Sequence, residues 1–404
     1  MDDERKFQQA LYSSKILPPI EILLITPWFP NRVHSQDGNF VRRFAELLSH
    51  RHKVTVLHVT PDPALKGRAL ELVTQKETFG KLVMAYYAGG GARVQRLVNR
   101  SRAWTTVRQA YRGTPALIHA HVLIDGGIVA MRMARQLGVP FVVSCHSSRY
   151  LEGESWWDRP LDYWLARRAA HRAFSLLPVS TALANGLRNA SMKATFNIVP
   201  NLVDRTHFAP TAPLSTRQGF HLLHLSDFSW QKRLDVLLVA FDLARKKDES
   251  LLLTIAGNGD PKVVENLIGN HPEIATAITL EGELSRSEVN ELMGEHDLFV
   301  LSSEVETQGI VLTEALCCGL PVVTTNCGGP ADLGLGPEDG TIVPVNDPRA
   351  LAAAILEWAK LGASSFTERQ ERHRRYVDRG SPQRISQQLE EIYLEALSVQ
   401  KTSR

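Results

Sequence analysis

The feature that most constrains the fold of this 404-residue chain is an alternation of short apolar runs with stretches whose apolar residues recur at helical spacing. The first example is an apolar run at residues 21–26, a loop through Gly38, a helical pattern at about 40–49 and a second run at 53–59. Strands that alternate with helices form βαβ units, which assemble into parallel sheets. The sequence therefore predicts an α/β protein.

Length, composition and charge indicate two domains. About 400 residues exceed what one hydrophobic core usually spans, and 44% apolar with 22% charged residues is ordinary globular composition. Prolines and asparagine interrupt the pattern at 197–210, where we expect a boundary. Residues 1–200 contain 27 Lys and Arg against 14 Asp and Glu, whereas residues 201–404 contain 19 against 29. We expect one domain over 1–200 and another over 201–380.

Two glutamates with seven residues between them, Glu306 and Glu314, flank Gly309. The preceding run at 297–303 is typical of a buried strand, and the spacing at 310–318 suits a helix. Open α/β sheets bind ligands beyond the carboxyl ends of their strands, and helix N-termini attract phosphate. The backbone amides of Gly309 and Ile310 are therefore candidate phosphate donors. A solvated loop acid and an ordinary acid at a helix start are the simpler explanation of the pair alone.

The surrounding residues extend this pattern from about 197 to 348. After the acidic pair come Gly-Leu-Pro-Val-Val at 319–323, Gly-Gly at 328–329, and Gly-Thr-Ile-Val-Pro-Val-Asn-Asp-Pro at 340–348; before it come apolar runs ending in glycine turns at 252–260 and 278–284. This stretch resembles the nucleotide-sugar-binding half of the retaining glycosyltransferases of family 4, group 1 type, which share their fold with glycogen synthases. The resemblance implies two Rossmann-like, doubly wound parallel-sheet domains facing a cleft (GT-B type). It also implies a C-terminal helix, within 381–404, that crosses back to the first domain.

The resemblance further implies that the second domain binds a nucleotide-diphosphate sugar. Glu314 would accept hydrogen bonds from ribose hydroxyls, and Glu306 from hydroxyls of the transferred sugar. The backbone from Gly282 to Leu284 would lie near the base. Lys232 would face the diphosphate.

Two positions beside Lys232 depart from the family pattern. Family members have arginine where this chain has Asp227, and glycine where it has Arg233. Lysine acts on phosphate as a point charge, whereas arginine can bind two oxygens at once, so the diphosphate loses a contact unless Arg233 or a loop amide replaces it. Lys232 and Arg233 are the candidate cations, and the alternative is a solvated lysine.

The first domain offers two candidates by the same resemblance. Gly38 lies in a loop that faces the donor phosphates in the family, although Asp37 replaces a second glycine. His146 follows the apolar run at 139–145 and matches a strand-end histidine beside the donor sugar. Such a histidine can donate to a sugar hydroxyl or transfer protons near neutral pH. An ordinary loop and a structural histidine are the alternatives.

A different class of site is suggested by His119 and His121, whose H-x-H spacing at a strand end can bind a metal ion, with Asp125 nearby. A catalytic zinc needs a third protein ligand and an open position. No matching histidine cluster follows in the sequence. A transferase is therefore the favoured prediction, and a metallohydrolase the less favoured one. The four cysteines lack C-x-x-C spacing and are expected to be reduced.

The implied reaction is hexosyl transfer from the nucleotide sugar to a glycan, lipid-linked or small-molecule acceptor, with retention of anomeric configuration and no metal or other cofactor. Its catalytic residues would be His146, Glu306 and Lys232, with the departing diphosphate stabilised by Lys232 and loop amides and helping to deprotonate the acceptor. A catalytically silent nucleotide-sugar-binding protein, and a sugar-nucleotide hydrolase or epimerase on the same fold, are the alternatives.

Location follows from the absence of a visible secretory signal or an apolar run of about 20 residues, and we expect a cytoplasmic protein. Residues 93–112 contain six arginines and no acid, interleaved with apolar residues, which suits peripheral contact with an anionic inner membrane face. A solvated helix and complementarity between the oppositely charged domains are the alternatives. Nucleic acid is not an expected partner. Trp156 and Trp157 are candidates to stack on a sugar ring or to anchor at an interface, and packing in the core or at the domain interface is the alternative.

Overall fold

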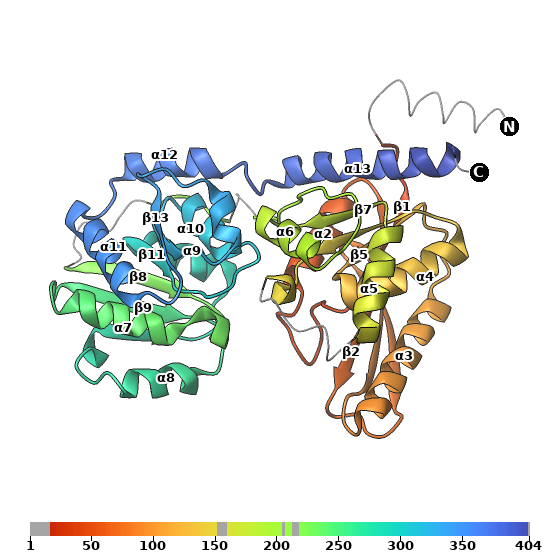
Figure 1. Ribbon diagram of the computed structural model, residues 1–404, viewed down its shortest axis with the longest axis horizontal. Coiled ribbons are helices and arrows are strands. Elements are labelled where there is room, and N and C mark those ends of the chain that lie inside the picture. Colours follow the sequence, from red (N-terminus) through yellow and green to blue (C-terminus); the bar gives the residue numbers. More distant parts are fainter. Residues whose placement is uncertain (1–16, 152–159, 204–206, 212–217, 403–404) are drawn as a thin grey trace. The chain divides into compact units, whose positions relative to one another are not determined.

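The computed structural model describes residues 17–151, 160–203, 207–211 and 218–402. Contacts divide the chain into a first unit of residues 1–179, 184–202 and 382–404, and a second unit of residues 180–183 and 203–381 (Figure 1). Trp156 and Trp157, predicted to be sugar-stacking or core residues, lie outside the described residues.

The first unit contains a seven-stranded sheet in the order β3-β4-β2-β1-β5-β6-β7. Neighbouring strands are parallel, except that the edge strand β3 is antiparallel to β4. The strands are β1 (Glu21–Thr26), β2 (Lys53–Asp62), β3 (Leu70–Glu77), β4 (Gly80–Ala88), β5 (Leu117–His121), β6 (Phe141–Cys145) and β7 (Ser175–Pro178). Because β2 and β5 flank β1 on opposite sides, the winding of the chain reverses between β1 and β5.

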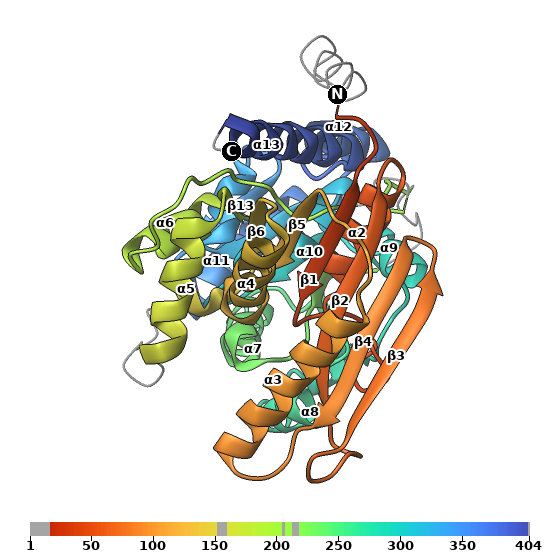
Figure 2. The same cartoon turned by 90° about the vertical axis from the view of Figure 1, so that its right-hand side faces the viewer.

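Helices cover this sheet. They are α2 (Asn39–Ser49), α3 (Arg93–Ala110), α4 (Ile128–Leu137), α5 (Pro160–Arg172) and α6 (Thr181–Asn189), with the short turns η1 (Leu123–Gly127) and η2 (Ser148–Tyr150). Figure 2 shows α3 lying beside β2 and β4, which it contacts. The C-terminal helix α13 (Pro382–Thr402) contacts α2 and adds Ile385, Leu389 and Tyr393 to the buried core around β1. Fully burying an aliphatic side chain contributes about 1.5–3 kcal/mol, so these contacts tie α13 to the first unit.

The second unit contains a parallel six-stranded sheet in the order β10-β9-β8-β11-β12-β13. Its strands are β8 (Phe220–Leu225), β9 (Leu251–Ala256), β10 (Ile278–Glu281), β11 (Leu298–Leu301), β12 (Val322–Thr325) and β13 (Gly340–Val343). Its helices are α7 (Leu234–Arg245), α8 (Pro261–Gly269), α9 (Arg286–Gly294), α10 (Ile310–Cys317), α11 (Pro348–Leu361) and α12 (Phe366–Tyr376), with the short 3₁₀ turns η4 (Trp230–Lys232), η5 (Ala275–Ala277) and η6 (Gly329–Leu333).

Both faces of the second sheet are covered because its strands are apolar on both sides. Leu222 faces a core shared with α7 and α11, whereas the next residue, Leu223, faces a second core shared with α10. Continuous apolar runs of this kind are typical of parallel strands buried between two helical layers. The two doubly wound sheets confirm the predicted fold class. The antiparallel edge strand β3 was not predicted, because most of its side chains are exposed. Its partly buried residues, Leu70, Val73 and Glu77, are three and four residues apart and lack the alternation of a half-buried strand.

Candidate active site

The candidate site of the second unit lies where the winding of its sheet reverses. Strand β8 lies between β9 and β11, so the loops after β8 and β11 leave the same edge of the sheet next to each other. Such switch points are the usual ligand sites of open α/β sheets. The two loops carry Lys232 and Glu306.

Lys232 and Glu306 form an ion pair across these loops, with 2.7 Å between Nζ and Oε1. The Ser303 hydroxyl also donates to Glu306 Oε1, at 3.0 Å, and the Ser302 hydroxyl donates to the backbone carbonyl of Lys232, at 2.7 Å. The side chains of Lys232 and Glu306 are only 19% and 12% exposed. The serines at the end of β11 therefore fix the cation and the carboxylate beside each other.

Burial and neighbouring acids act in opposite directions on the Lys232 ammonium. Burial alone would lower its pKa, but attraction and hydrogen bonding from Glu306, followed by attraction from Asp227, raise the pKa above its ordinary value. Lys232 is therefore positively charged at neutral pH. A fixed cation in a site shielded from water interacts strongly with negative charge that enters it.

The backbone around Glu306 is held by the loop after β12. Glu306 donates its N–H to the Cys327 carbonyl at 2.9 Å, and Gly329 donates to the Glu306 carbonyl at 2.8 Å. A Cβ at Gly329 would lie 2.4 Å from Gln308 Cα. The Gly-Gly turn at 328–329 is thus required for close packing against the acidic motif, which gives that sequence pattern a physical cause.

Gly309 is the N-cap residue of α10 and has the left-handed conformation, with φ 74°. As a glycine, Gly309 contributes no side-chain cap to the first turn of this helix. Glu314 lies within α10 and is partly buried. Gly282 follows β10 in an exposed turn, where an added Cβ would meet no atom within 4 Å, and Leu284 is partly buried. The roles predicted for these four residues remain predictions.

Arg233 occupies its family glycine position in the conformation that glycine prefers, with φ 47° and ψ 50°. Its guanidinium is already paired with Glu304 at 2.7 Å and with Asp235 at 2.9 Å. Asp227 is exposed and accepts hydrogen bonds from the Ser229 hydroxyl and N–H. Lys232 is therefore the better placed of the two predicted diphosphate cations.

In the first unit, His146 follows β6 and is 7% exposed. Its Nε2 lies 3.1 Å from His121 Nδ1, and its ring packs on Phe40 with 4.3 Å between centroids. Burial lowers the pKa of His146 to about 3, helped by His119 and opposed by Asn201. The imidazole is therefore neutral at physiological pH, which suits a hydrogen-bonding role better than the predicted proton transfer.

His119 of the H-x-H pair that was predicted as an alternative metal site is held by hydrogen bonds and ring stacking within the fold. His119 hydrogen-bonds through Nδ1 to the Tyr393 hydroxyl at 2.6 Å and through Nε2 to the Ser144 hydroxyl at 2.8 Å. Its ring stacks on His121 with 4.6 Å between centroids. Asp125 pairs with Arg100 at 2.9 Å. Both nitrogens of His119 are thus engaged within the fold.

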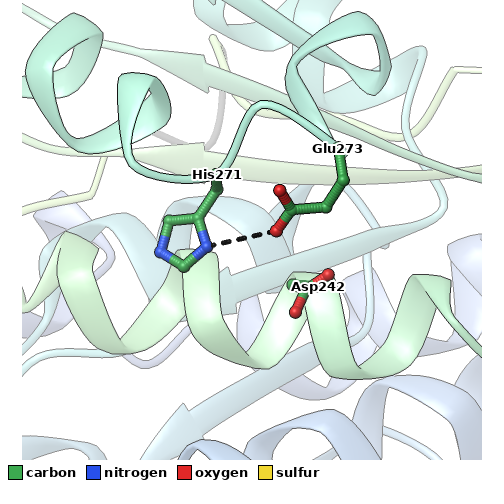
Figure 3. A group of neighbouring side chains, drawn as sticks. All are labelled: Asp242, His271 and Glu273. Carbon is green, nitrogen blue, oxygen red and sulfur yellow. Dashed lines mark ion pairs between the residues drawn. The ribbon is translucent and has the colours of Figure 1, made fainter.

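Three possible metal ligands that the sequence did not suggest lie together: Asp242, His271 and Glu273 (Figure 3). Among the described residues they form the one such group. His271 Nδ1 lies 3.6 Å from a Glu273 oxygen. Lys246 Nζ lies 2.6 Å from Asp242 Oδ2, so this carboxylate already has a cationic partner. Asp242 belongs to α7, whereas His271 and Glu273 belong to the loop after α8. Because these segments are separated in the sequence, the group could not be recognised there.

The surroundings of Gly38 predict why glycine is needed in the loop between β1 and α2. A Cβ there would lie 2.3 Å from the Trp28 carbonyl atoms, whereas Gly67, at nearly the same φ (61° against 63°), would meet no atom within 4 Å. We expect Gly67→Ala to destabilise the protein by about 1–2 kcal/mol from backbone strain alone, and Gly38→Ala by about 3–5 kcal/mol because overpacking is added. Urea unfolding of both variants measures the difference. Equal losses would show that the close approach at Gly38 is unimportant.

The arginine-rich stretch at 93–112 forms α3 and the residues after it. Trp104 and Val107 are buried, while Val94, Leu97 and Val98 are 72%, 46% and 43% exposed. The N-terminal half of α3 is therefore both basic and apolar at the surface. Within the described residues, none of the helices is long and apolar enough to cross a membrane.

Two doubly wound parallel-sheet units, with a cation and a carboxylate at the switch point of the second, have the architecture of sugar-transfer enzymes of GT-B type. The family model for group 1 glycosyl transferases matches residues 214–379, and that for glycosyltransferase family 4 matches residues 38–207. The chain belongs to the group 1 glycosyltransferases of family 4, as the sequence predicted.

Similar proteins agree in fold and family. Glycogen synthase of Mycobacterium tuberculosis is 25% identical over 361 residues, which cover 83% of this chain and 85% of the relative. N-acetyl-alpha-D-glucosaminyl L-malate synthase of Bacillus anthracis is 25% identical over 318 residues, covering 73% and 78%. Sucrose-phosphate synthase from Thermosynechococcus elongatus superposes with a TM-score of 0.77 at 18% identity, covering 94% of this chain and all of that structure. Anabaena HepE, solved with UDP-glucose, gives a TM-score of 0.66 at 18% identity, covering 94% and 100%.

Proposed function

We propose that this glycosyltransferase moves a hexosyl group from a nucleotide-diphosphate sugar to an acceptor hydroxyl, with retention of anomeric configuration and without a metal ion. The observation that carries the proposal is the charged, largely buried Lys232 held against Glu306 at the switch point of the second sheet. Its position suits the diphosphate of a donor, since ligands of open α/β sheets bind there. HepE, which shares the fold, is described with UDP-glucose.

Lys232 and the first turn of α10 would act on the departing diphosphate. Negative charge grows on the leaving oxygen as the bond to the anomeric carbon breaks, and a preorganised cation with a helix N-terminus stabilises that charge. These groups would do the work that a divalent ion does in metal-dependent transferases. Metal independence is part of the proposal for this reason.

Glu306 and Glu314 would orient the donor. Glu306 carries hydrogen-bond acceptors beside Lys232, where hydroxyls of the transferred sugar would lie, and Glu314 would accept from the ribose. His146 of the first unit would contribute as a neutral hydrogen-bonding group to the sugar, consistent with its lowered pKa. Reaction requires the donor and the acceptor to be held with reacting atoms about 3–3.5 Å apart.

Proton NMR of donor turnover tests this proposal. The protein would be incubated with α-linked UDP-, ADP- and GDP-glucose in excess chelator, and the anomeric signals of the first product followed. We expect one donor to be consumed, with the α-anomer of the glycoside or of free glucose appearing first. A β-anomer, or activity lost with chelator and restored by Mg²⁺, would contradict the proposal. Nucleotide binding without turnover of any donor would favour the catalytically silent alternative.

The exposed face of α3 supports a second, finer proposal of peripheral contact with an anionic membrane. Its Val94, Leu97 and Val98 are exposed and lie among arginines in the sequence. Apolar and basic residues on one surface suit the interface of an anionic bilayer, where each cation contributes about 1 kcal/mol. Flotation with phosphatidylglycerol vesicles, compared with phosphatidylcholine vesicles, tests the contact, and equal recovery with both would exclude it.

A further inference from the structure

The group formed by Asp242, His271 and Glu273 contains none of the predicted donor-site residues, and none of its members has a role in the proposed transfer. Each residue offers one ligand atom, and these atoms all lie within 4.8 Å of one another. Figure 3 shows the His271 and Glu273 side chains extending from the loop after α8 and the Asp242 carboxylate lying beside them on α7. One imidazole and two carboxylates are thus gathered in the second unit.

Asp242 is the most unusual member, because one oxygen of its carboxylate is buried without a partner. The residue is 8% exposed. Oδ2 accepts a hydrogen bond from Lys246, whereas Oδ1 is buried and has no hydrogen-bond partner within the described part of the chain. Leaving a buried charged group incompletely paired is unfavourable, and a bound ion is one explanation for such an atom in a folded protein. Asp242 therefore has an oxygen available to a cation.

The loop that carries the other two ligand residues is held in place by its own backbone. His271 donates its N–H to the Ile268 carbonyl at 2.8 Å, and Ile274 donates to the His271 carbonyl at 3.1 Å. Pro272 stands between the two ligand residues and has a fixed φ. The Ile274 side chain is buried in the core that also contains residues of α7. His271 and Glu273 are thus ordered in advance, which lowers the entropic cost of binding.

The spacing and chemistry of the ligand atoms suit zinc. Zinc bonds to nitrogen and oxygen of about 2.0–2.2 Å, arranged as a tetrahedron, place ligand atoms about 3.4 Å apart. His271 Nδ1 and a Glu273 oxygen are already 3.6 Å apart, and the Glu273 side chain is 46% exposed, so it is free to turn. The widest separation therefore has to close by about 1.4 Å at most. Imidazole favours zinc, whereas magnesium and calcium prefer ligands that are all oxygen.

We propose that Asp242, His271 and Glu273 bind a zinc ion that fastens α7 to the loop after α8. Three protein ligands leave one position of the tetrahedron, which water fills. An ion that binds the folded chain and not the unfolded chain stabilises the fold, so the site is a structural clamp of the second unit. It takes no part in sugar transfer, and the proposed metal-independent reaction is unaffected.

Lys246 competes with the ion for Asp242 and so provides a specific test. Its Nζ lies 2.6 Å from Asp242 Oδ2, and its side chain is 62% exposed. An exposed ion pair of this kind is weak, so zinc can displace the ammonium into water. We expect Lys246→Met to strengthen zinc binding at least fivefold, because it removes the competing charge. The matched control Lys247→Met makes the same change of net charge at the next exposed lysine and should alter the affinity less than twofold.

Titration calorimetry of the tag-free full chain, freed of metal with chelator, measures zinc binding. We expect His271→Gln and Glu273→Gln each to weaken the tightest zinc ion at least tenfold. The control Glu265→Gln alters an exposed carboxylate of α8 and should leave the affinity unchanged. Magnesium and calcium should bind at least 100-fold more weakly than zinc. Zinc affinity unchanged in both His271→Gln and Glu273→Gln, or equal binding of magnesium, would overturn the inference.

Amide hydrogen exchange locates the ion without reference to turnover. Zinc should increase the protection of peptides covering 261–277 and α7 in the unmodified protein, and should not do so in His271→Gln. The exposed Glu273→Gln serves the same purpose if His271→Gln does not fold. In chelator, kcat for donor turnover should differ less than twofold between the unmodified protein and either variant. Protection that zinc leaves unchanged at 261–277, or turnover that requires zinc and is lost in both variants, would overturn the clamp.

Discussion

Replacing Lys232 with alanine should lower kcat for donor turnover by about 100- to 1,000-fold, the loss typical of removing one preorganised group that stabilises developing negative charge. Lys232 is charged, 19% exposed and bound to Glu306 at 2.7 Å, so no water or flexible side chain readily replaces it. The change also leaves the Glu306 carboxylate without its cation. An unpaired carboxylate at this position repels the diphosphate. Steady-state kinetics with the preferred donor measures both kcat and KM.

Two further variants show whether the lost turnover comes from Lys232 itself. Lys262→Ala removes an exposed lysine of α8 in the same unit and should change kcat by less than twofold. The double variant Lys232→Ala with Glu306→Gln removes the unpaired carboxylate and should regain only a minor part of the loss. Full recovery in the double variant would mean that Lys232 serves only to neutralise Glu306. An unchanged kcat in Lys232→Ala would remove Lys232 from the mechanism.

Acid should destabilise the first unit strongly. Burial lowers the pKa of His58 to about 4 and those of His119 and His146 to about 3, against 6.5 for the unfolded chain. The unfolded state therefore takes up protons first as the pH falls. The stability that these neutral side chains contribute is complete above about pH 6.5 and is lost between pH 6.5 and about 3–4. At pH 5 each costs about 2 kcal/mol, a large part of the 5–15 kcal/mol by which domains are usually stable.

Amide hydrogen exchange at pH 7 and pH 5, corrected for the intrinsic exchange rate, measures this effect for each unit. Peptides from β5 and β6 should lose protection at pH 5 before those from β8 and β11, since His224 is the one histidine of the second unit with a pKa lowered comparably, to about 4, among the described residues. His58→Asn should reduce the pH dependence by about one proton, whereas the exposed His34→Ala should not. Equal protection at both pH values would show that the histidines are accessible to protons in the fold.

The main sheets were predictable because their evidence is local. The apolar run at 21–26 coincides with β1, and the run predicted to begin at 252 starts one residue after the first residue of β9. The glycines at 38 and 309 mark helix starts. Most side chains of these strands are buried, so both runs are largely apolar, which made them visible in the sequence. Strand β3 escaped prediction because it is an edge strand whose side chains are mostly exposed.

The candidate site was predictable in its parts but not in its contacts. The acidic motif and Lys232 stand 74 residues apart, and only the order of β8 and β11 in the sheet brings them together. The engagement of His119 by Tyr393, 274 residues away, has no sequence signal. The strain at Val122 is equally invisible, since valine gives no sign of positive φ. At Arg233 the structure explains a sequence pattern. The backbone there is left-handed, the conformation that glycine prefers, which accounts for the glycine that family members have at this position.

Donor binding is the most direct measure of the proposed nucleotide-sugar site of the second unit. Calorimetric titration of UDP-, ADP- and GDP-glucose would be carried out in excess chelator on the unmodified protein, Lys232→Ala and Glu314→Ala. We expect one donor to bind without metal and each substitution to weaken its affinity at least tenfold, because each removes a charged contact. Absence of binding by every nucleotide sugar without metal, or tight binding that neither substitution changes, would contradict the assignment of the donor site to the switch point of the second unit.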